Sequence, residues 1–153
     1  MAEPFKNPRI YPLAWFALAV IAILCLNRWL PIATLLPPPY HWIGLVLTVP
    51  SLAIVLHSGA AFLKAKTGLL PFSEATKLVT CGFYRYTRNP MYLGMTGFLA
   101  GFAVILGSVS SFVPVILFAW IIDRHFIRNE EAFLLDTFGK DYREYMRRVR
   151  RWI

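Results

Sequence analysis

The stretch MYLGMTGFLAGFAVILGSVSSFVPVILFAWII, residues 91–122, contains 32 consecutive residues without a formal charge. A single helix of that length would reach roughly 48 Å, whereas the hydrocarbon core of a bilayer is about 30 Å thick and is crossed by about 20 helical residues. The small and polar residues GSVSS at 107–111 offer a place for the chain to turn. We therefore expect two membrane-spanning helices here, at about 90–107 and 112–137, of which the second continues past the membrane.

Two more uncharged runs precede this stretch, 18 residues at 10–27 and 24 residues at 40–63. Each is long enough to span a bilayer, so we expect helices at about 13–30 and 42–63. The first run lacks the small-residue cleavage site of a signal peptide and is expected to be retained. Only 16% of the whole chain is charged, against about a quarter in soluble domains. Together these features predict an all-α membrane protein with about four transmembrane helices.

The net charge of +8 is distributed unevenly across the expected membrane. Fifteen of the 16 basic residues fall on one face, and only Arg28 falls on the other. This asymmetry predicts cytosolic N- and C-termini, because lysine and arginine are enriched on the cytosolic side. Attraction to anionic headgroups, worth about 1 kcal/mol per basic residue, accounts for the basic balance without nucleic acid as a partner. The residues on the basic face are Lys6, Arg9, Lys64, Lys66, Lys77, Arg85, Arg88, Arg124, Arg128, Lys140, Arg143, Arg147, Arg148, Arg150 and Arg151.

The polar segments on this face are expected to form a cytosolic surface. Residues 64–89 are rich in aromatic side chains, so we expect an ordered loop rather than a disordered linker. A helical extension in the cytosol is expected at the C-terminus, with a stop at Gly139 and a final basic helix at 140–151. We interpret residues 1–153 as a single membrane domain.

Neither a disulfide nor a metal site is expected. Cys25 and Cys81 fall at opposite sides of the membrane, which excludes a bond between them. The three histidines are scattered and show no metal-ligand spacing. His57 lies inside the expected helix 42–63, where an ionisable residue is either functional or hydrogen-bonded to the backbone.

The first candidate for chemistry is LVTCGFYRYTRNPMY, residues 78–92. Gly82 allows a ligand to approach the backbone closely. The free N–H groups of the helix that starts at Asn89 can hold an anion such as a carboxylate. In the alternative interpretation, the tyrosines form an interfacial belt while Arg85 and Arg88 bind lipid headgroups. This segment alone leaves both interpretations open.

The second candidate is the pair Glu130 and Glu131, two adjacent carboxylates on an otherwise basic face. A cationic ligand could bind between or beside them. In the alternative interpretation, Glu131 pairs with Arg128 on an ordinary helix surface, which would contribute only about 0.2–0.5 kcal/mol. The pair alone does not establish a site.

The two candidates together resemble a known family. The string LVTCGFYRYTRNPMYLG at 78–94, followed after the hairpin by NEEAFLLDTFGKDYREYMRRVRRWI at 129–153, is similar to integral membrane methyltransferases. That family includes isoprenylcysteine carboxyl methyltransferases and phospholipid N-methyltransferases. The resemblance covers residues 78–153 and implies S-adenosylmethionine as the cofactor, held at the cytosolic ends of the helices.

The resemblance also implies roles for individual residues. Arg88, Asn89 and Tyr92 match an Arg-His-Pro-x-Tyr motif. The glutamates would face the cationic end of the cofactor. The implied catalytic residues are Arg88, Glu130 and Glu131. The residues implied to bind the cofactor are Leu78, Val79, Gly82, Tyr84, Asn89, Tyr92, Glu130 and Glu131.

Asn89 departs from the family pattern, which has histidine at this position in many members. Asparagine keeps the hydrogen-bonding capacity of histidine but cannot titrate near neutral pH. If the reaction requires a base, His57 or His125 would have to supply it.

The implied function is in-line methyl transfer to a lipophilic acceptor that arrives from the bilayer, most like isoprenylcysteine carboxyl methyltransferase. Phospholipid ethanolamine N-methylation is the alternative within the family. The same motifs resemble the C-terminal part of membrane sterol reductases, which bind NADPH, although four spans leave little room for both a sterol and a dinucleotide. A non-catalytic membrane scaffold is the alternative outside enzymes. The sequence leaves open whether the acceptor is a carboxylate, an amine or a thiol.

Overall fold

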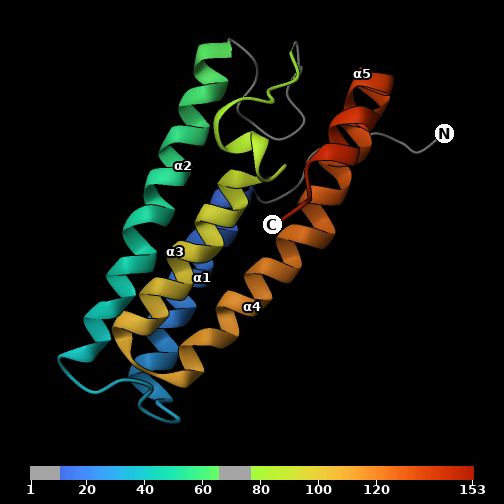
Figure 1. Ribbon diagram of the computed structural model, residues 1–153. Coiled ribbons are helices and arrows are strands. Elements are labelled where there is room, and N and C mark those ends of the chain that lie inside the picture. The colour runs from blue at the N-terminus through green and yellow to red at the C-terminus, as the bar shows by residue number, and fades with distance from the viewer. Residues whose placement is uncertain (1–10, 66–76) are drawn as a thin grey trace.

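The computed structural model describes residues 11–65 and 77–153, which are helical and contain no β-strand (Figure 1). The prediction of an all-α membrane fold is therefore confirmed. Apolar stretches long enough to cross a bilayer lie in Pro12–Trp29, Tyr40–Lys64 and Val109–Arg148, and the apolar helix Pro90–Leu106 is slightly shorter. The main helices are α1 (Pro12–Trp29), α2 (Leu45–Ala65), α3 (Pro90–Leu106), α4 (Phe112–Ile121) and α5 (Arg128–Arg148).

The expected hairpin at 107–111 is present between α3 and α4. Gly107 ends α3 in the left-handed region, with φ of 77°, a conformation that glycine adopts without steric cost. The 3-10 turn η3 (Val109–Ser111) then leads directly into α4. The connection after α1 holds this turn in place, since the N–H of Leu35 donates to the carbonyl of Gly107 at 2.6 Å.

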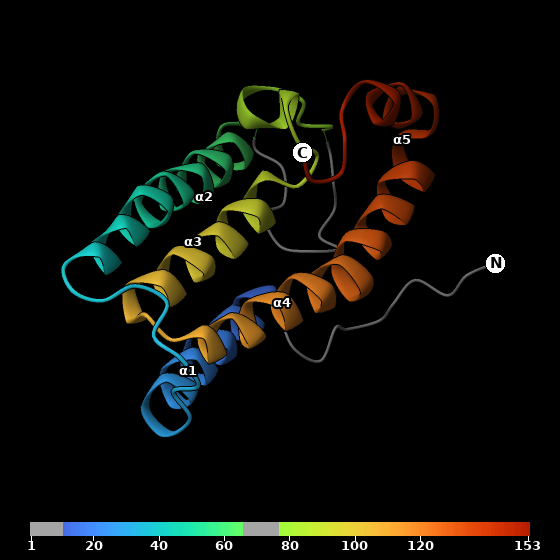
Figure 2. The same ribbon diagram turned by 60° about the horizontal axis from the view of Figure 1, so that its bottom comes forward.

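A seam of small residues joins α2 to α3, which lie side by side in both views (Figure 2). A Cβ atom added at Gly101 would lie 2.7 Å from the carbonyl oxygen of Gly44, and one added at Gly94 would lie 2.8 Å from that of Ser51. The backbones are therefore in direct contact, as expected for small residues spaced along a membrane helix. This contact holds α3 against the first half of α2 and the residue that precedes it.

The apolar core lies among α1, α3, α4 and the π-helical turn η4 (Ile122–Ile127). Many other apolar side chains remain exposed, including Leu13 at 70% and Val46 at 74%. Exposed apolar surface on this scale is typical of a lipid-facing protein. The most deeply buried apolar core residues are Ile23, Leu99, Ala103, Phe118, Ile122 and Ile127.

The consecutive elements α4, η4 and α5 form a long, interrupted rod (Figure 1). The wide turn η4 joins α4 to α5, and π-helical turns occur frequently at functional sites. Gly139, at φ 50° and ψ −109°, breaks α5 into two helical parts, where the sequence predicts a stop. The second part ends at Arg148 rather than at residue 151, because Val149 is extended and the chain turns back toward α3.

The cytosolic loop predicted at 64–89 is described only in part, because residues 66–76, which include Lys66, lie outside the described residues. Residues 1–10, which include Lys6 and Arg9, also lie outside them. The described part contains a 3-10 turn, η2 (Gly82–Arg85), that packs on α2. Cys25 and Cys81 are both free. The assignment of the whole chain to a single membrane domain stays a prediction.

Candidate active site

A cavity of about 500 Å³ opens among α1, α2, α3, α5 and the segment that precedes α3. The lining residues that come from the middle of the helices are apolar, namely Phe16, Leu52, Val55, Met95 and Phe98. The residues that come from the start of α3, from α5 and from the preceding segment include charged and phenolic side chains. The cavity therefore joins an apolar part within the membrane-spanning helices to a polar end.

Glu130 supplies one carboxylate at this polar end. Its Oε1 accepts a hydrogen bond of 2.6 Å from the hydroxyl of Tyr92, the third residue of α3. Both side chains line the cavity, and Tyr92 is only 9% exposed. The bond ties the start of α3 to α5 at the cavity wall and orients the carboxylate.

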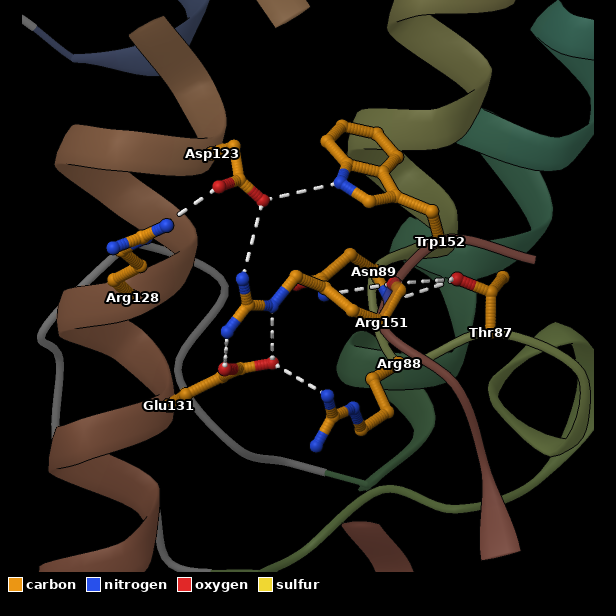
Figure 3. Close-up of polar contacts among 8 residues, drawn as sticks. All are labelled: Thr87, Arg88, Asn89, Asp123, Arg128, Glu131, Arg151 and Trp152. Carbon is orange, nitrogen blue, oxygen red and sulfur yellow. Dashed lines mark hydrogen bonds and ion pairs between the residues drawn. The ribbon is translucent and has the colours of Figure 1, made fainter. Parts of the chain in front are cut away.

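Glu131 has both carboxylate oxygens engaged by arginines (Figure 3). Oε1 lies 3.1 Å from Nη2 of Arg88 and accepts from Nε of Arg151 at 3.2 Å. Oε2 accepts from Nη2 of Arg151 at 2.6 Å. The pair of Glu131 with Arg128, which is the alternative interpretation of the sequence, is absent among the described residues, and Nε of Arg128 lies 3.5 Å from Oδ2 of Asp123 instead.

Arg88 lines the cavity and uses one of its nitrogen atoms for Glu131. Its Nε and Nη1 atoms are buried and have no hydrogen-bond partner among the described residues. An unpaired buried donor costs about 1–3 kcal/mol, and more when the group is charged. These two donors therefore mark a place where an anionic ligand would be stabilised.

The non-helical residues 149–153, which we call the strap, return from the end of α5 to the segment before α3 (Figure 3). The N–H of Arg88 donates to the carbonyl of Arg150 at 2.9 Å. The carbonyl of Arg151 accepts from Oγ1 of Thr87 and from Nδ2 of Asn89, each at 3.1 Å. The strap thereby fixes the backbone on which Arg88 stands.

Asp123 anchors the strap from the other side, in the wide turn η4. Its Oδ1 accepts from the indole nitrogen of Trp152 at 3.1 Å and lies 3.5 Å from Nη1 of Arg151. Thr87, Asp123, Arg151 and Trp152 are not identified from the sequence as site residues. Asp123 is the first charge after the 32-residue apolar run, and this position is the one signal that could have drawn attention to it.

Tyr84, a residue of η2, lines the cavity. Its carbonyl accepts a 2.7 Å hydrogen bond from the hydroxyl of Tyr145 in α5. Burial raises the pKa of the Tyr84 phenol well above its ordinary value, and the neighbouring Tyr145 adds to this effect. The phenol of Tyr84 therefore stays neutral.

Most residues singled out from the sequence line this one cavity: Leu78, Val79, Tyr84, Arg88, Asn89, Tyr92, Glu130 and Glu131. Gly82 lies instead against His57 of α2, where an added Cβ would be 3.2 Å from Nε2 of that histidine. His125 is exposed and packs beside Trp120. Neither histidine lines the cavity in the described part of the chain.

Comparison with known proteins places this geometry in context. The family model described as phospholipid methyltransferase matches residues 39–141. A protein-S-isoprenylcysteine O-methyltransferase of Schizosaccharomyces pombe is 37% identical over 75 residues, covering 47% of this chain and 30% of the relative. The human protein of that name is 35% identical over 77 residues, covering 50% and 27%. An uncharacterized protein of Haemophilus influenzae is 36% identical over 63 residues, covering 41% of this chain and 100% of its own length. The chain thus matches about a third of the length of the isoprenylcysteine relatives.

Proposed function

This chain belongs to the phospholipid methyltransferase family, and from that premise we propose that it transfers a methyl group from S-adenosylmethionine to a lipophilic acceptor. The proposed reaction is most like isoprenylcysteine carboxyl methylation, and phospholipid ethanolamine N-methylation is the alternative. The observation that carries the proposal is the polar end of the cavity. There, Arg88 and Glu130 line the same cavity, and the Nε and Nη1 atoms of Arg88 are buried without a partner among the described residues.

This pair of groups complements the amino-acid end of S-adenosylmethionine, which carries one carboxylate and one ammonium. The guanidinium of Arg88 would receive the carboxylate, because two of its nitrogen atoms are buried without a partner among the described residues and a charged N–H donor binds a carboxylate strongly. The carboxylate of Glu130 would receive the ammonium. A cation and an anion in one cavity suit a zwitterionic ligand better than a singly charged one.

The nucleoside would lie against the apolar and phenolic residues of the segment that precedes α3. Leu78, Val79 and Tyr84 line the cavity there, and Tyr142 of α5 lies on its wall. Gly82 would act indirectly, because it allows η2 to lie close to His57. These assignments follow the family resemblance and the position of the lining residues.

Glu131 receives a different role in this proposal from the one that the motif alone suggests. Both of its oxygens are engaged by Arg88 and Arg151, so it holds the guanidinium of Arg88 rather than the cationic end of the cofactor. Asn89 likewise uses its amide to bind the carbonyl of Arg151. Its replacement of histidine is therefore compatible with a positioning role.

The bound cofactor would supply a methyl group attached to its sulfonium. The acceptor would attack the methyl carbon, and the cofactor would leave as a neutral thioether. The protein's contribution is to hold the donor, align the acceptor and exclude water, and such positioning can supply about 7–11 kcal/mol of the barrier. The apolar residues of α1, α2 and α3 would hold the lipid chain of the acceptor. A carboxylate or thiolate acceptor would react in its charged form, whereas an amine would first lose a proton.

The proposed location is the membrane, with the cavity's polar end and both termini at the cytosolic face. Its support is the basic surface of α5 and the strap, where Lys140, Arg143, Arg147, Arg148 and Arg150 are exposed. Anionic headgroups of the cytosolic leaflet attract such residues. In this orientation a lipid acceptor would approach through the bilayer while the cofactor approaches from the cytosol.

Calorimetry on the detergent-purified protein tests the proposal. We expect a saturable binding heat with S-adenosylmethionine and with S-adenosylhomocysteine. A signal with NADPH alone would replace the proposal by a reductase, and silence with all three ligands would favour a scaffold. A screen of prenylated thiol-acids, phosphatidylethanolamine and lipophilic amines and thiols, with transfer of a labelled methyl group as the readout, would then identify the acceptor.

A further inference from the structure

The carboxylate of Glu131 is shared unequally between two arginines. Arg151 approaches both oxygens, with Nη2 at 2.6 Å from Oε2 and Nε at 3.2 Å from Oε1. Arg88 reaches only Oε1, through Nη2 at 3.1 Å. A carboxylate and a guanidinium form their strongest pair when two parallel bonds join them. Arg151 has that arrangement, and Arg88 does not.

The geometry points to Arg151 as a positioning residue that keeps Arg88 available for an anionic ligand. Because Arg151 occupies Oε2, Arg88 cannot pair with Glu131 through two bonds. Its Nε and Nη1 donors are left buried and unpaired among the described residues, on a side chain that lines the cavity and is 10% exposed. This inference rests on the proposed function, in which those donors bind the carboxylate of the cofactor.

Arg151 is itself held at both its side chain and its backbone. Asp123 lies 3.5 Å from its Nη1 and is held in turn by Trp152, whose indole nitrogen donates to Oδ1 at 3.1 Å. The carbonyl of Arg151 accepts hydrogen bonds from Thr87 and Asn89. The hydrogen bond to Glu131 raises the pKa of Arg151 above its ordinary value, so the residue stays charged. A side chain fixed in this way can act on Arg88 without touching the ligand.

Removal of Arg151 has a specific consequence in this arrangement. Oε2 of Glu131 would lose its partner, and the guanidinium of Arg88 would turn to form the two-bond pair. One of the two unpaired nitrogen atoms of Arg88 would then be used internally. Ligands that carry a carboxylate should lose affinity, whereas ligands that lack one should not.

Two related ligands distinguish this effect from a general loss of structure. S-adenosylhomocysteine carries the amino-acid carboxylate, and 5′-methylthioadenosine has the same nucleoside and thioether without the amino acid. For Arg151→Ala we expect calorimetry to show S-adenosylhomocysteine bound about tenfold more weakly or worse, as for loss of a charge-assisted hydrogen bond, with 5′-methylthioadenosine changed less than about twofold. Arg150→Ala is the matched control, because it removes an exposed positive charge from the same strap, and both ligands should bind as to the wild type.

Two further variants complete the test. Arg151→Lys keeps the charge but cannot form the two-bond pair, so it should weaken S-adenosylhomocysteine selectively and by less than Arg151→Ala; it also carries the test if the alanine variant does not fold. In an Arg88→Ala background, Arg151→Ala should have little added effect on S-adenosylhomocysteine.

Equal weakening of both ligands, or no change for Arg151→Ala, would overturn the positioning role while leaving the proposed function intact. A wild-type protein that binds neither ligand would overturn the proposed function, and this inference with it.

Discussion

The hydroxyl of Tyr92 donates a 2.6 Å hydrogen bond to Oε1 of Glu130, a residue 38 positions later in the chain. The two residues come from the two sequence motifs, one at the start of α3 and the other in α5. Their contact brings the motifs into one cavity wall and places a carboxylate at its polar end.

Glu130→Gln should weaken binding of S-adenosylhomocysteine by about 10- to 100-fold, corresponding to about 1.5–3 kcal/mol for a hydrogen bond to a charged group. The physical reason is that the ammonium of the ligand would lose its counter-charge. Calorimetry measures the change, and Asp136→Asn, an exposed carboxylate on the same helix, is the control. Equal affinities for wild type and Glu130→Gln would remove Glu130 from the site.

Glu131→Gln should lower the free energy of unfolding by about 3 kcal/mol, because the buried Arg88 would lose the carboxylate that pairs with it. Thermal unfolding in detergent without ligand provides the measurement. Glu144→Gln, an exposed change on the same helix, should leave the transition unchanged. A wild-type transition for Glu131→Gln would show that this ion pair adds nothing to stability.

Gly101→Ala should destabilise the protein by about 1–3 kcal/mol, because the added methyl group would meet the backbone of α2 and force the helices apart. The nearest atoms include the carbonyl oxygen of Gly44 at 2.7 Å. Gly59→Ala is the matched control, since nothing lies within 4 Å of its added Cβ, and it should be neutral or slightly stabilising. Thermal unfolding of both variants compares them directly; equal transitions would contradict the close α2–α3 contact.

Cys81 should react with a membrane-impermeant maleimide only from the cytosolic side. The residue is free and exposed, and a Cys25→Ser variant makes it the sole cysteine. Labelling is compared in right-side-out and inside-out vesicles. As a control, Trp29→Cys in a background without Cys25 and Cys81 should be labelled from the opposite side, because Trp29 is 75% exposed and ends α1 at the face proposed to lie opposite the cytosol. Labelling of Cys81 from outside would reverse the proposed orientation.

The helices could be predicted well from the sequence because their signals are local. Uncharged runs identify the spans, the residues GSVSS at 107–111 identify the turn, and Gly139 marks the break in α5. The end of α5 could not be predicted, because Val149, Arg150 and Arg151 continue a helix-like composition. The hydrogen bonds that hold these residues outside the helix come from Thr87 and Asn89, more than 60 residues earlier.

The site residues also fall into those that have a local sequence signal and those that depend on distant contacts. Motif residues such as Arg88 and Glu130 could be proposed from their spacing, and the structure brings them to one cavity. The contacts of Arg151 with Glu131 and Asp123 span 20 and 28 positions and leave no local pattern. The engagement of both Glu131 oxygens follows from those contacts, so it could not be read from adjacent glutamates.

The wide turn Ile122–Ile127 makes the rod tolerant of a change in length at one place. A π-helical turn closes its hydrogen bonds over one more residue than an α-helical turn does. Deleting one residue there can be absorbed as the turn tightens, so Glu130 and Glu131 would keep their direction. The same deletion at the lipid-exposed Ile116 would rotate all later residues by about 100° and turn both carboxylates away from the cavity. Chain length in this protein is therefore adjustable beside the site and constrained within the membrane.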